Sequence, residues 1–460
     1  MIALQGTGRP IGGAQFCAHR LLRPVIIGAN EFAHLPGVLR LAAKGPYLSA
    51  TSSTLDGLAR TSPRLFDDCL LPAETVKIRD QARLFAERVL APRAPELNSA
   101  EESSAVFPRD ILRRMADAGL YTIPFSADVG GRALQYPMLG AAMVLEELAY
   151  FTPAVASALY DAQALLVGRT LDGAPASIRH EFLPRLVRGE IVGSFATSEP
   201  DASTDLSAAA MRTTAVPVSG GFRLSGRKRW ITNACAADIM TVLCVVDGAQ
   251  AMLLVDMHAD GVAVSEPDRK MGNRLQLTSD VEFTDVFVPD EHLIAVPGRG
   301  LASALKTLSL GRIGIGAIGV GMGQCAFDHA VAHLRRRSAF GAKLGSFQHW
   351  QFRFAEHAIA LETARSLYQK AARKSDDRDA PEPEAAMAKV TGSRVAVDIA
   401  RDAIQVHGAY GFVRQLPADG SINHLESIWR DSKVGEIYEG ANEVQLWSIA
   451  RIALGRDVTG

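Results

Sequence analysis

The chain has 460 residues, of which 48% are apolar and 22% charged, and its formal net charge is −1. This length predicts roughly two to four domains with sizeable cores. The near-neutral charge excludes the basic footprint of a nucleic-acid-binding or membrane-surface protein. We expect no membrane-spanning segment, because no run of about 18 apolar residues is present. Five scattered cysteines without a Cys-x-x-Cys pair favour a reducing compartment and argue against a metal site.

The beginning of the chain differs from the rest in charge. Residues 1–65 hold seven Lys or Arg and only two acids, Glu31 and Asp56. This composition fits a transit peptide, a disordered tail or an over-long start of translation. We assign residues 1–70 to an N-terminal extension of unknown role. The Ala- and Arg-rich chain favours a bacterial cytoplasmic protein, whereas a transit peptide would place it in the mitochondrial matrix.

Residues 71–190 have a helical pattern and are predicted to form an N-terminal helical domain. Ile78, Ala82 and Phe85 fall on one face of the first helix. Proline at an early position starts another helix at Pro108. Small-residue, buried helices are predicted over Ala141–Tyr150 and Ala154–Leu166.

The period changes over residues 191–297, where short β-rich runs alternate with Gly, Asp, Asn and Pro turns. A block of strands between two helical blocks is typical of a separate domain. The predicted strands are Val192–Ala196, Phe222–Leu224, Ile239–Val246, Met252–Val255 and Val281–Phe283.

Residues 298–460 are helical again, and long helices with few breaks predict an up-and-down bundle. The predicted helices are Leu305–Leu334, Phe347–Lys374, Glu384–His407 and Lys433–Ile452. The predicted fold is therefore mainly α with an inserted β domain: an N-terminal helical domain, a middle β-barrel-like domain and a C-terminal four-helix bundle.

One motif is excluded as a nucleotide site. Residues 314–319 fit the pattern G-x-G-x-x-G, but a dinucleotide site needs a strand before the motif and an acid about 20 residues later. Here the motif lies within a predicted helix, and residues 329–355 contain no acid. We interpret these glycines as small residues at which helices pack closely.

The segment Tyr438-Glu439-Gly440 is the most informative in the chain. A carboxylate held against apolar neighbours has a raised pKa and can act as a base near neutral pH. The following glycine lets a ligand approach closely. Taken alone, the segment also fits a helix start with a solvated acid.

Four further segments have features of ligand sites, and each also has a plain structural interpretation. Hydroxyls and backbone N–H groups in residues 195–205 suit a flat heterocycle or a phosphate, but also a Ser-rich turn. Trp230 offers a plane for stacking and Thr232 a donor, unless the indole is part of the core. Arg337 can pair with phosphate or cap a helix. Residues 405–412 end a helix in a glycine-rich corner, as a simple C-cap would.

In this order the five segments resemble the acyl-CoA dehydrogenase flavoprotein family, over roughly residues 74–455. The resemblance implies that Glu439 removes the α proton of an acyl-CoA thioester while the β hydride passes to N5 of FAD. It implies substrate contacts by Thr204, Arg312, Tyr438 and Gly440. It implies FAD contacts by Phe195, Thr197, Ser198, Thr204, Trp230, Ile231, Thr232, Ala441 and Glu443. It further implies contacts with FAD across a subunit boundary by Arg337, Phe340, Gln348, Gln405, Val406, Gly408 and Ala409.

The chain also departs from the family pattern. Asp201 and Ser203 replace glycines that are common in the family's flavin loop. Gly311 stands where some relatives carry the base instead, so Glu439 has no rival. Residues 413–429 form a longer connection than the family norm, which would reshape the neighbouring pocket.

The resemblance implies a homotetramer built from dimers, with electron-transfer flavoprotein as electron acceptor and no metal, nucleic-acid or membrane partner. Three alternatives stay open. They are a dehydrogenase of acyl groups carried by acyl carrier protein, an acyl-CoA oxidase, and a non-catalytic flavin- or acyl-binding scaffold. Flavin monooxygenases of this fold generally lack the base, so Glu439 argues against that branch.

Overall fold

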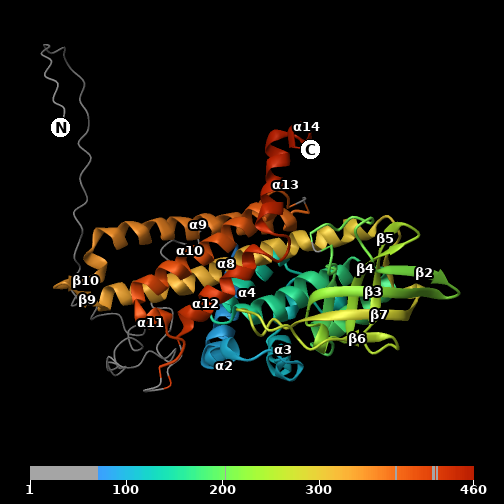
Figure 1. Ribbon diagram of the computed structural model, residues 1–460, viewed down its shortest axis with the longest axis horizontal. Coiled ribbons are helices and arrows are strands. Elements are labelled where there is room, and N and C mark those ends of the chain that lie inside the picture. Colours follow the sequence, from blue (N-terminus) through green and yellow to red (C-terminus); the bar gives the residue numbers. More distant parts are fainter. Residues whose placement is uncertain (1–70, 203, 379–380, 417–419, 421–422, 460) are drawn as a thin grey trace, which may run out of the picture. The chain divides into compact units, whose positions relative to one another are not determined.

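The computed structural model describes residues 71–202, 204–378, 381–416, 420 and 423–459 (Figure 1). All of them belong to one compact unit, Ser53–Gly460. The N-terminal extension predicted for residues 1–70 lies outside the described residues. Helices, then strands, then helices follow one another along the chain, as predicted.

The N-terminal helices begin near the predicted positions. Pro108 directly precedes α3, and the predicted segment 154–166 corresponds to α5 and η7. η7 has wide, π-type turns, which are frequent at functional sites, and all of its residues are buried. The helices are α1 (Ala73–Phe85), η2 (Ala86–Leu90), α2 (Ala94–Ser99), α3 (Arg109–Asp117), α4 (Pro137–Ala149), α5 (Pro153–Val155), η7 (Ala156–Gly168), α6 (Arg169–Asp172) and α7 (Ala176–Val187).

The middle of the chain forms an eight-stranded sheet with the order β6-β7-β3-β2-β4-β5-β8, and β1 pairs in parallel with β4. β2, β6 and β8 were not predicted, because they are short and mostly exposed or half-buried, and Pro217 interrupts β2. The strands are β1 (Gly193–Ala196), β2 (Thr214–Val218), β3 (Gly221–Thr232), β4 (Ile239–Val246), β5 (Ala249–Asp256), β6 (Val262–Val264), β7 (Thr278–Pro289) and β8 (Leu293–Ala295).

The C-terminal region is helical, with a short hairpin between its first two long helices. Its elements are α8 (Gly300–Arg336), β9 (Ser338–Ala339), β10 (Ala342–Lys343), α9 (Gln348–Asp376), α10 (Glu384–His407), α11 (Ala409–Phe412), α12 (His424–Ser432), α13 (Asn442–Leu454) and α14 (Arg456–Thr459). The predicted helix 433–452 is wrong in its first half. The chain turns at Glu439 (φ 56°) and Gly440 (φ 86°), which a helix cannot accommodate. The predicted connection 413–429 is also partly helical, since α12 begins at His424.

The glycines of residues 314–319 lie inside α8, where they allow α10 to approach closely. A Cβ atom on Gly316 would lie 2.9 Å from the carbonyl oxygen of Ala388, and one on Gly319 would lie 2.2 Å from that of Gly392. The helix-packing interpretation of this motif is therefore confirmed. Among the described helices α8 is also long and apolar enough to cross a membrane, but most of its apolar stretch is buried in the bundle.

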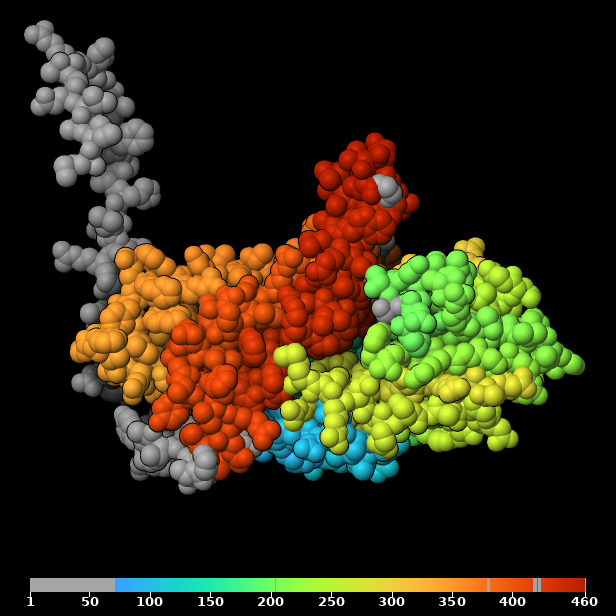
Figure 2. Space-filling view, viewed as in Figure 1, coloured from blue at the N-terminus to red at the C-terminus, as the bar shows by residue number. Residues whose placement is uncertain are grey.

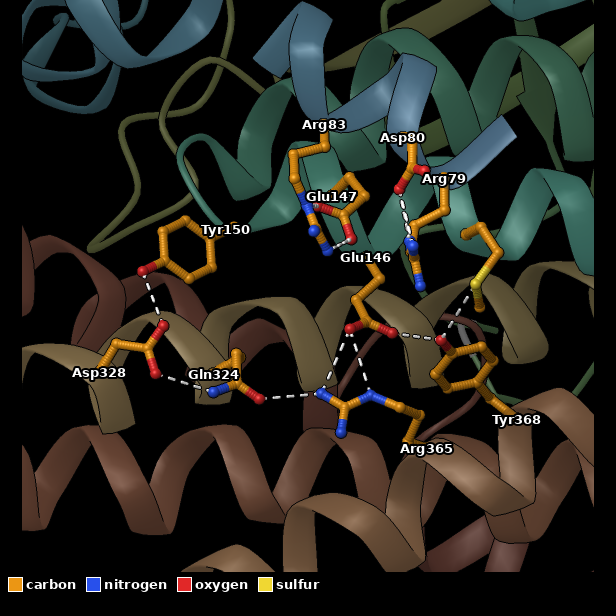
Figure 3. Close-up of polar contacts among 11 residues, drawn as sticks. Arg79, Asp80, Arg83, Glu146, Glu147, Tyr150, Gln324, Asp328, Arg365 and Tyr368 are labelled. Atoms are coloured by element: carbon orange, nitrogen blue, oxygen red, sulfur yellow. Dashed lines mark hydrogen bonds and ion pairs between the residues drawn. The ribbon is translucent and has the colours of Figure 1, made fainter. Parts of the chain in front are cut away.

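A buried polar network joins α4, α8 and α9 (Figure 3). Arg365 of α9 donates from Nε to Glu146 Oε1 of α4 (3.2 Å) and from Nη2 to Gln324 Oε1 of α8 (2.9 Å). Gln324 donates to Asp328 Oδ1 (2.9 Å), and the Tyr150 hydroxyl donates to Asp328 Oδ2 (2.9 Å). Buried networks of this kind fix how helices align with one another. This network therefore sets the position of α8, which carries one wall of the site described next.

An apolar cluster joins the sheet to the helices. It contains Val167 of η7, Leu243 of β4, Leu254 of β5 and Ala304 of α8, all fully buried. Burial of each of the valine and leucine side chains contributes about 1.5–3 kcal/mol. The cluster therefore holds the end of η7 between the sheet and the first turns of α8.

Candidate active site

The site is built around the turn that carries Glu439. Arg312 of α8 lies with its Nε 3.4 Å from the carbonyl oxygen of Glu439. Directly after the turn, the side chain of Asn442 is buried and accepts a hydrogen bond from Lys389 Nζ of α10 (2.8 Å). These contacts from α8 and α10 hold Glu439 in a left-handed conformation that is uncommon for a residue with a side chain.

Glu439 is half-buried, and its carboxyl oxygen Oε2 lies buried against α8. Its Oε2 has no hydrogen-bond partner among the described residues. A Cβ atom on Gly311 would lie 2.7 Å from Oε2 and 2.9 Å from the carboxyl carbon, so only glycine leaves room for this group. Burial raises the pKa of Glu439 to about 7, although the positive charges of Arg312 and Lys389 act in the opposite direction. A carboxyl group with this pKa is suited to proton abstraction near neutral pH.

A second buried acid, which the sequence analysis did not select, lies on the same side of α8. Asp161 of η7 is 3% exposed, and its Oδ1 has no hydrogen-bond partner among the described residues. A Cβ atom on Gly314 would lie 2.1 Å from that oxygen. The sequence feature that could have indicated Asp161 is that it is the one acid within the apolar run 154–166.

The end of β3 supplies the predicted flavin-stacking residues. Trp230 is 47% exposed and has a positive φ of 57°, while Ile231 is buried. The Thr232 hydroxyl lies 3.3 Å from Gln276 Nε2. The next residue, Asn233, donates to the carbonyl oxygen of Ala158 in η7 (2.8 Å), which ties the end of β3 to the helix that carries Asp161. The Arg229 guanidinium lies 5.3 Å from the centroid of the Trp230 ring. The exposed part of this aromatic plane is a suitable surface for a flat ring.

The predicted hydroxyl loop follows β1, in which Phe195 is half-buried. The loop is held in place by the buried Lys228 of β3, which donates to the Thr197 carbonyl (3.1 Å) and to Glu199 Oε1 (2.9 Å). The Ser198 carbonyl accepts from the backbone N–H of Arg229 (3.0 Å), which is adjacent to Trp230. This bond places Ser198 beside the end of β3 that carries Trp230.

The remaining residues of this group lie near the surface. Thr204 and Asp201 are exposed, and residue 203 is outside the described part of the chain. At the start of α13, Ala441 is half-buried and Glu443 is exposed.

The hydroxyl group of Tyr438 has a pKa well above its ordinary value. Burial is the largest cause, and the negative charges of Asp161 and Glu439 raise the pKa further. Tyr438 is half-buried and lies near enough to the two carboxyl groups for their charges to act on its hydroxyl.

The second predicted group of flavin contacts lies far from Glu439 in the same chain. Arg312 and Arg337 are separated by 25 residues along α8, which corresponds to about 37 Å of helix. In Figure 1, β9, β10 and α11 accordingly lie at the opposite end of the bundle from β3 and β7. Phe340 is 97% exposed and Val406 is buried. Arg337, Gln348, Gln405, Gly408 and Ala409 are exposed.

No group of three or more His, Cys, Asp or Glu side chains in the described residues is arranged to hold a metal ion. Among the described residues, the cysteines at positions 235, 244 and 325 form no disulfide bond.

Comparison with known proteins places the whole described chain in one family. Residues 72–190, 194–286 and 298–454 match the acyl-CoA dehydrogenase N-terminal, middle and C-terminal domains. The chain is 33% identical to the mitochondrial short-chain specific acyl-CoA dehydrogenase of Mus musculus over 385 residues, 83% of this chain and 90% of that protein. It is 31% identical to subunit CarC of the caffeyl-CoA reductase-Etf complex of Acetobacterium woodii, over 82% of this chain and 97% of CarC. Butyryl-CoA dehydrogenase from Megasphaera elsdenii has a similar structure, with a TM-score of 0.78 and 29% identity over 85% of this chain and 99% of that one.

Proposed function

The chain belongs to the acyl-CoA dehydrogenase family, and we propose that it catalyses the FAD-dependent α,β-dehydrogenation of an acyl-CoA thioester with Glu439 as the base. The observation that carries this proposal is the Glu439 carboxyl group, whose buried Oε2 has no hydrogen-bond partner among the described residues and whose pKa is raised to about 7. A positioned base of this kind contributes about 10²–10⁴-fold to the rate.

The thioester oxygen gains negative charge as the α proton leaves, so it needs hydrogen-bond donors. The backbone N–H of Glu439 makes no backbone hydrogen bond among the described residues and is one available donor. One well-placed donor of this kind contributes about 3–4 kcal/mol to transition-state stabilisation. The same residue would then supply both the base and a donor, and the left-handed turn would orient both.

FAD is the cofactor that accepts the β hydride when bound. The exposed indole of Trp230 and the hydroxyl of Thr232 fit the face and the edge of its ring system. The hydroxyl loop around Ser198 is hydrogen-bonded to the backbone of β3 next to Trp230. These residues would orient the ring and exclude water from it.

A partner subunit would complete the flavin site. The predicted contacts around Arg337, Phe340 and Gln405 lie about 37 Å along α8 from the turn at Glu439. Phe340 and Phe412 are 97% and 82% exposed, which is typical of residues that a partner covers. Figure 2 shows that α13 and α14 project from the surface, and Trp447 of α13 is also half exposed. We expect a tetramer built from dimers that share flavin sites.

Electron-transfer flavoprotein is the proposed electron acceptor. The related CarC is a subunit of a complex that contains Etf, which supports this choice over oxygen. Reoxidation of the reduced enzyme by electron-transfer flavoprotein, without peroxide formation in air, distinguishes the dehydrogenase from an oxidase.

The test of the base is Glu439→Gln in the FAD-loaded enzyme, with Glu436→Gln as a matched control. Glu436 lies three residues earlier, and its carboxyl group pairs with Lys433 (2.6 Å). We expect Glu439→Gln to keep FAD and to lose about 10²-fold or more in kcat/KM, because the base is gone. A Glu439→Gln enzyme that retains more than about a tenth of wild-type kcat/KM would contradict the assignment.

A further inference from the structure

Two carboxyl groups lie side by side on one face of α8. Gly311 and Gly314 are three residues apart, which is about 4.5 Å of helix rise and one helical face. The carboxyl group of Glu439 lies against the first glycine and that of Asp161 against the second. A Cβ atom at either position would overlap with the carboxyl group beside it. A ligand atom held by one carboxyl group is therefore within a few carbon–carbon bonds of an atom held by the other.

Asp161 forms no ion pair with any residue that the structure describes. Arg312 is engaged by Glu382 (2.8 Å), and Lys389 donates to Asn442 (2.8 Å). The groups that act on Asp161 are its own burial and the negative charge of Glu439, and both raise its pKa well above the ordinary value. A buried carboxyl group without a partner is costly, and such groups are retained chiefly where a ligand or a reaction uses them.

On the assumption that Glu439 is the base, as proposed above, we propose that Asp161 is a specificity-determining residue that binds a hydrogen-bond-donating substituent on the acyl chain, close to the reacting carbons. Glu439 reaches the α carbon, so Asp161 reaches a substituent on the β or γ carbon. An ammonium group would pair with an ionised Asp161, and a hydroxyl group would bond to either form of it. The preferred substrate then carries a polar group where a simple fatty acyl chain has only methylene groups.

The experiment measures binding without turnover, in the FAD-loaded Glu439→Gln enzyme. Butyryl-CoA, 3-hydroxybutyryl-CoA and 3-aminobutyryl-CoA are titrated separately, and the change in the flavin absorbance spectrum reports the dissociation constant. We expect the hydroxy or the amino thioester to bind about tenfold tighter or more than butyryl-CoA. Preference for the amino compound would identify an ammonium ligand, and preference for the hydroxy compound a hydroxyl ligand.

Asp161→Leu in the same Glu439→Gln background should abolish this preference and leave the affinity for butyryl-CoA within about threefold of its parent, because only the polar contact is removed. Asp161→Ala serves the same purpose if leucine disturbs FAD retention. Equal or tighter binding of butyryl-CoA by the parent would overturn the proposal, as would a preference that survives both substitutions. Loss of the base assignment would appear separately, as turnover by Glu439→Gln alone.

Discussion

Substitution of Gly311 by alanine tests the geometry that places the base. The added Cβ atom would lie 2.7 Å from Glu439 Oε2, so the carboxyl group would have to withdraw by about 0.7 Å to reach an ordinary contact of 3.4 Å. A misplacement of about 1 Å at a reacting group can cost about 10²-fold in rate. We therefore expect Gly311→Ala to lower kcat by about tenfold or more while KM and FAD content stay within about twofold.

Gly323→Ala is the matched control, because the nearest atom to its Cβ would be the flexible end of Leu361 at 3.2 Å. Steady-state kinetics with an artificial electron acceptor, together with the flavin absorbance of the purified enzyme, supply the readouts. Normal kcat in Gly311→Ala would refute the close contact between α8 and the carboxyl group. A side chain at position 311 would start from a Cβ atom 2.7 Å from the position of Glu439 Oε2. Gly311→Glu should therefore restore part of the activity that Glu439→Gly removes.

Three further predictions concern the pH dependence, the cofactor and the bundle. Lys389→Met removes a positive charge that lowers the pKa of Glu439. The acid limb of the pH profile of kcat/KM, near pH 7 in the wild type, should therefore move to higher pH. An unmoved limb would show that Lys389 does not act on the base. Trp230→Ala should lower FAD retention in gel filtration with little change in Tm, whereas Phe287→Ala, which removes a similarly exposed aromatic ring, should retain FAD; equal flavin content in both variants would argue against stacking. Gly319→Val forces a side chain into the backbone of α10 and should lower the free energy of unfolding by about 1–3 kcal/mol, which denaturant titration measures; unchanged stability would show that the two helices can separate freely.

The long, regular helices and strands could be predicted because their apolar patterns and the residues that flank them indicated the same element. Glu384–His407 is a helix over the predicted residues, since Pro383 precedes it and Gly408 follows it. Ile239–Val246 is a strand as predicted, since a run of branched apolar residues suits a buried strand. β2 was missed because it is mostly exposed and contains Pro217, so its pairing with β3 depends on tertiary contacts.

The site was predictable only where one residue carried the signal. Tyr438-Glu439-Gly440 indicated a base, but the apolar pattern continues across it, so a helix was predicted where the chain turns at Glu439 and Gly440. The burial of the carboxyl group depends on Gly311, which is 128 residues earlier in the sequence. Asp161 was missed because nothing local distinguishes a functional acid from an incidental one in an apolar run. Only the fold places it beside Glu439.

The raised pKa of Glu439 also predicts how the stability of the folded chain depends on pH. Because the folded-state pKa is raised from 4.5 to about 7, the stability that this group contributes is complete below about pH 4.5 and is lost as the pH rises through about 7. Glu439→Gln removes the ionisation, so this variant should have a higher Tm than the wild type above pH 7. The difference should shrink towards pH 4.5, and a Tm difference that is independent of pH would contradict the burial of the carboxyl group.

The most direct test of the proposed function is to mix the FAD-loaded enzyme with butyryl-CoA in the absence of oxygen and follow the flavin absorbance. The account predicts that the wild type loses its yellow colour, whereas Glu439→Gln holds the same amount of FAD and keeps its colour. A purified chain that binds no flavin, or a Glu439→Gln enzyme that bleaches as fast as the wild type, would contradict it.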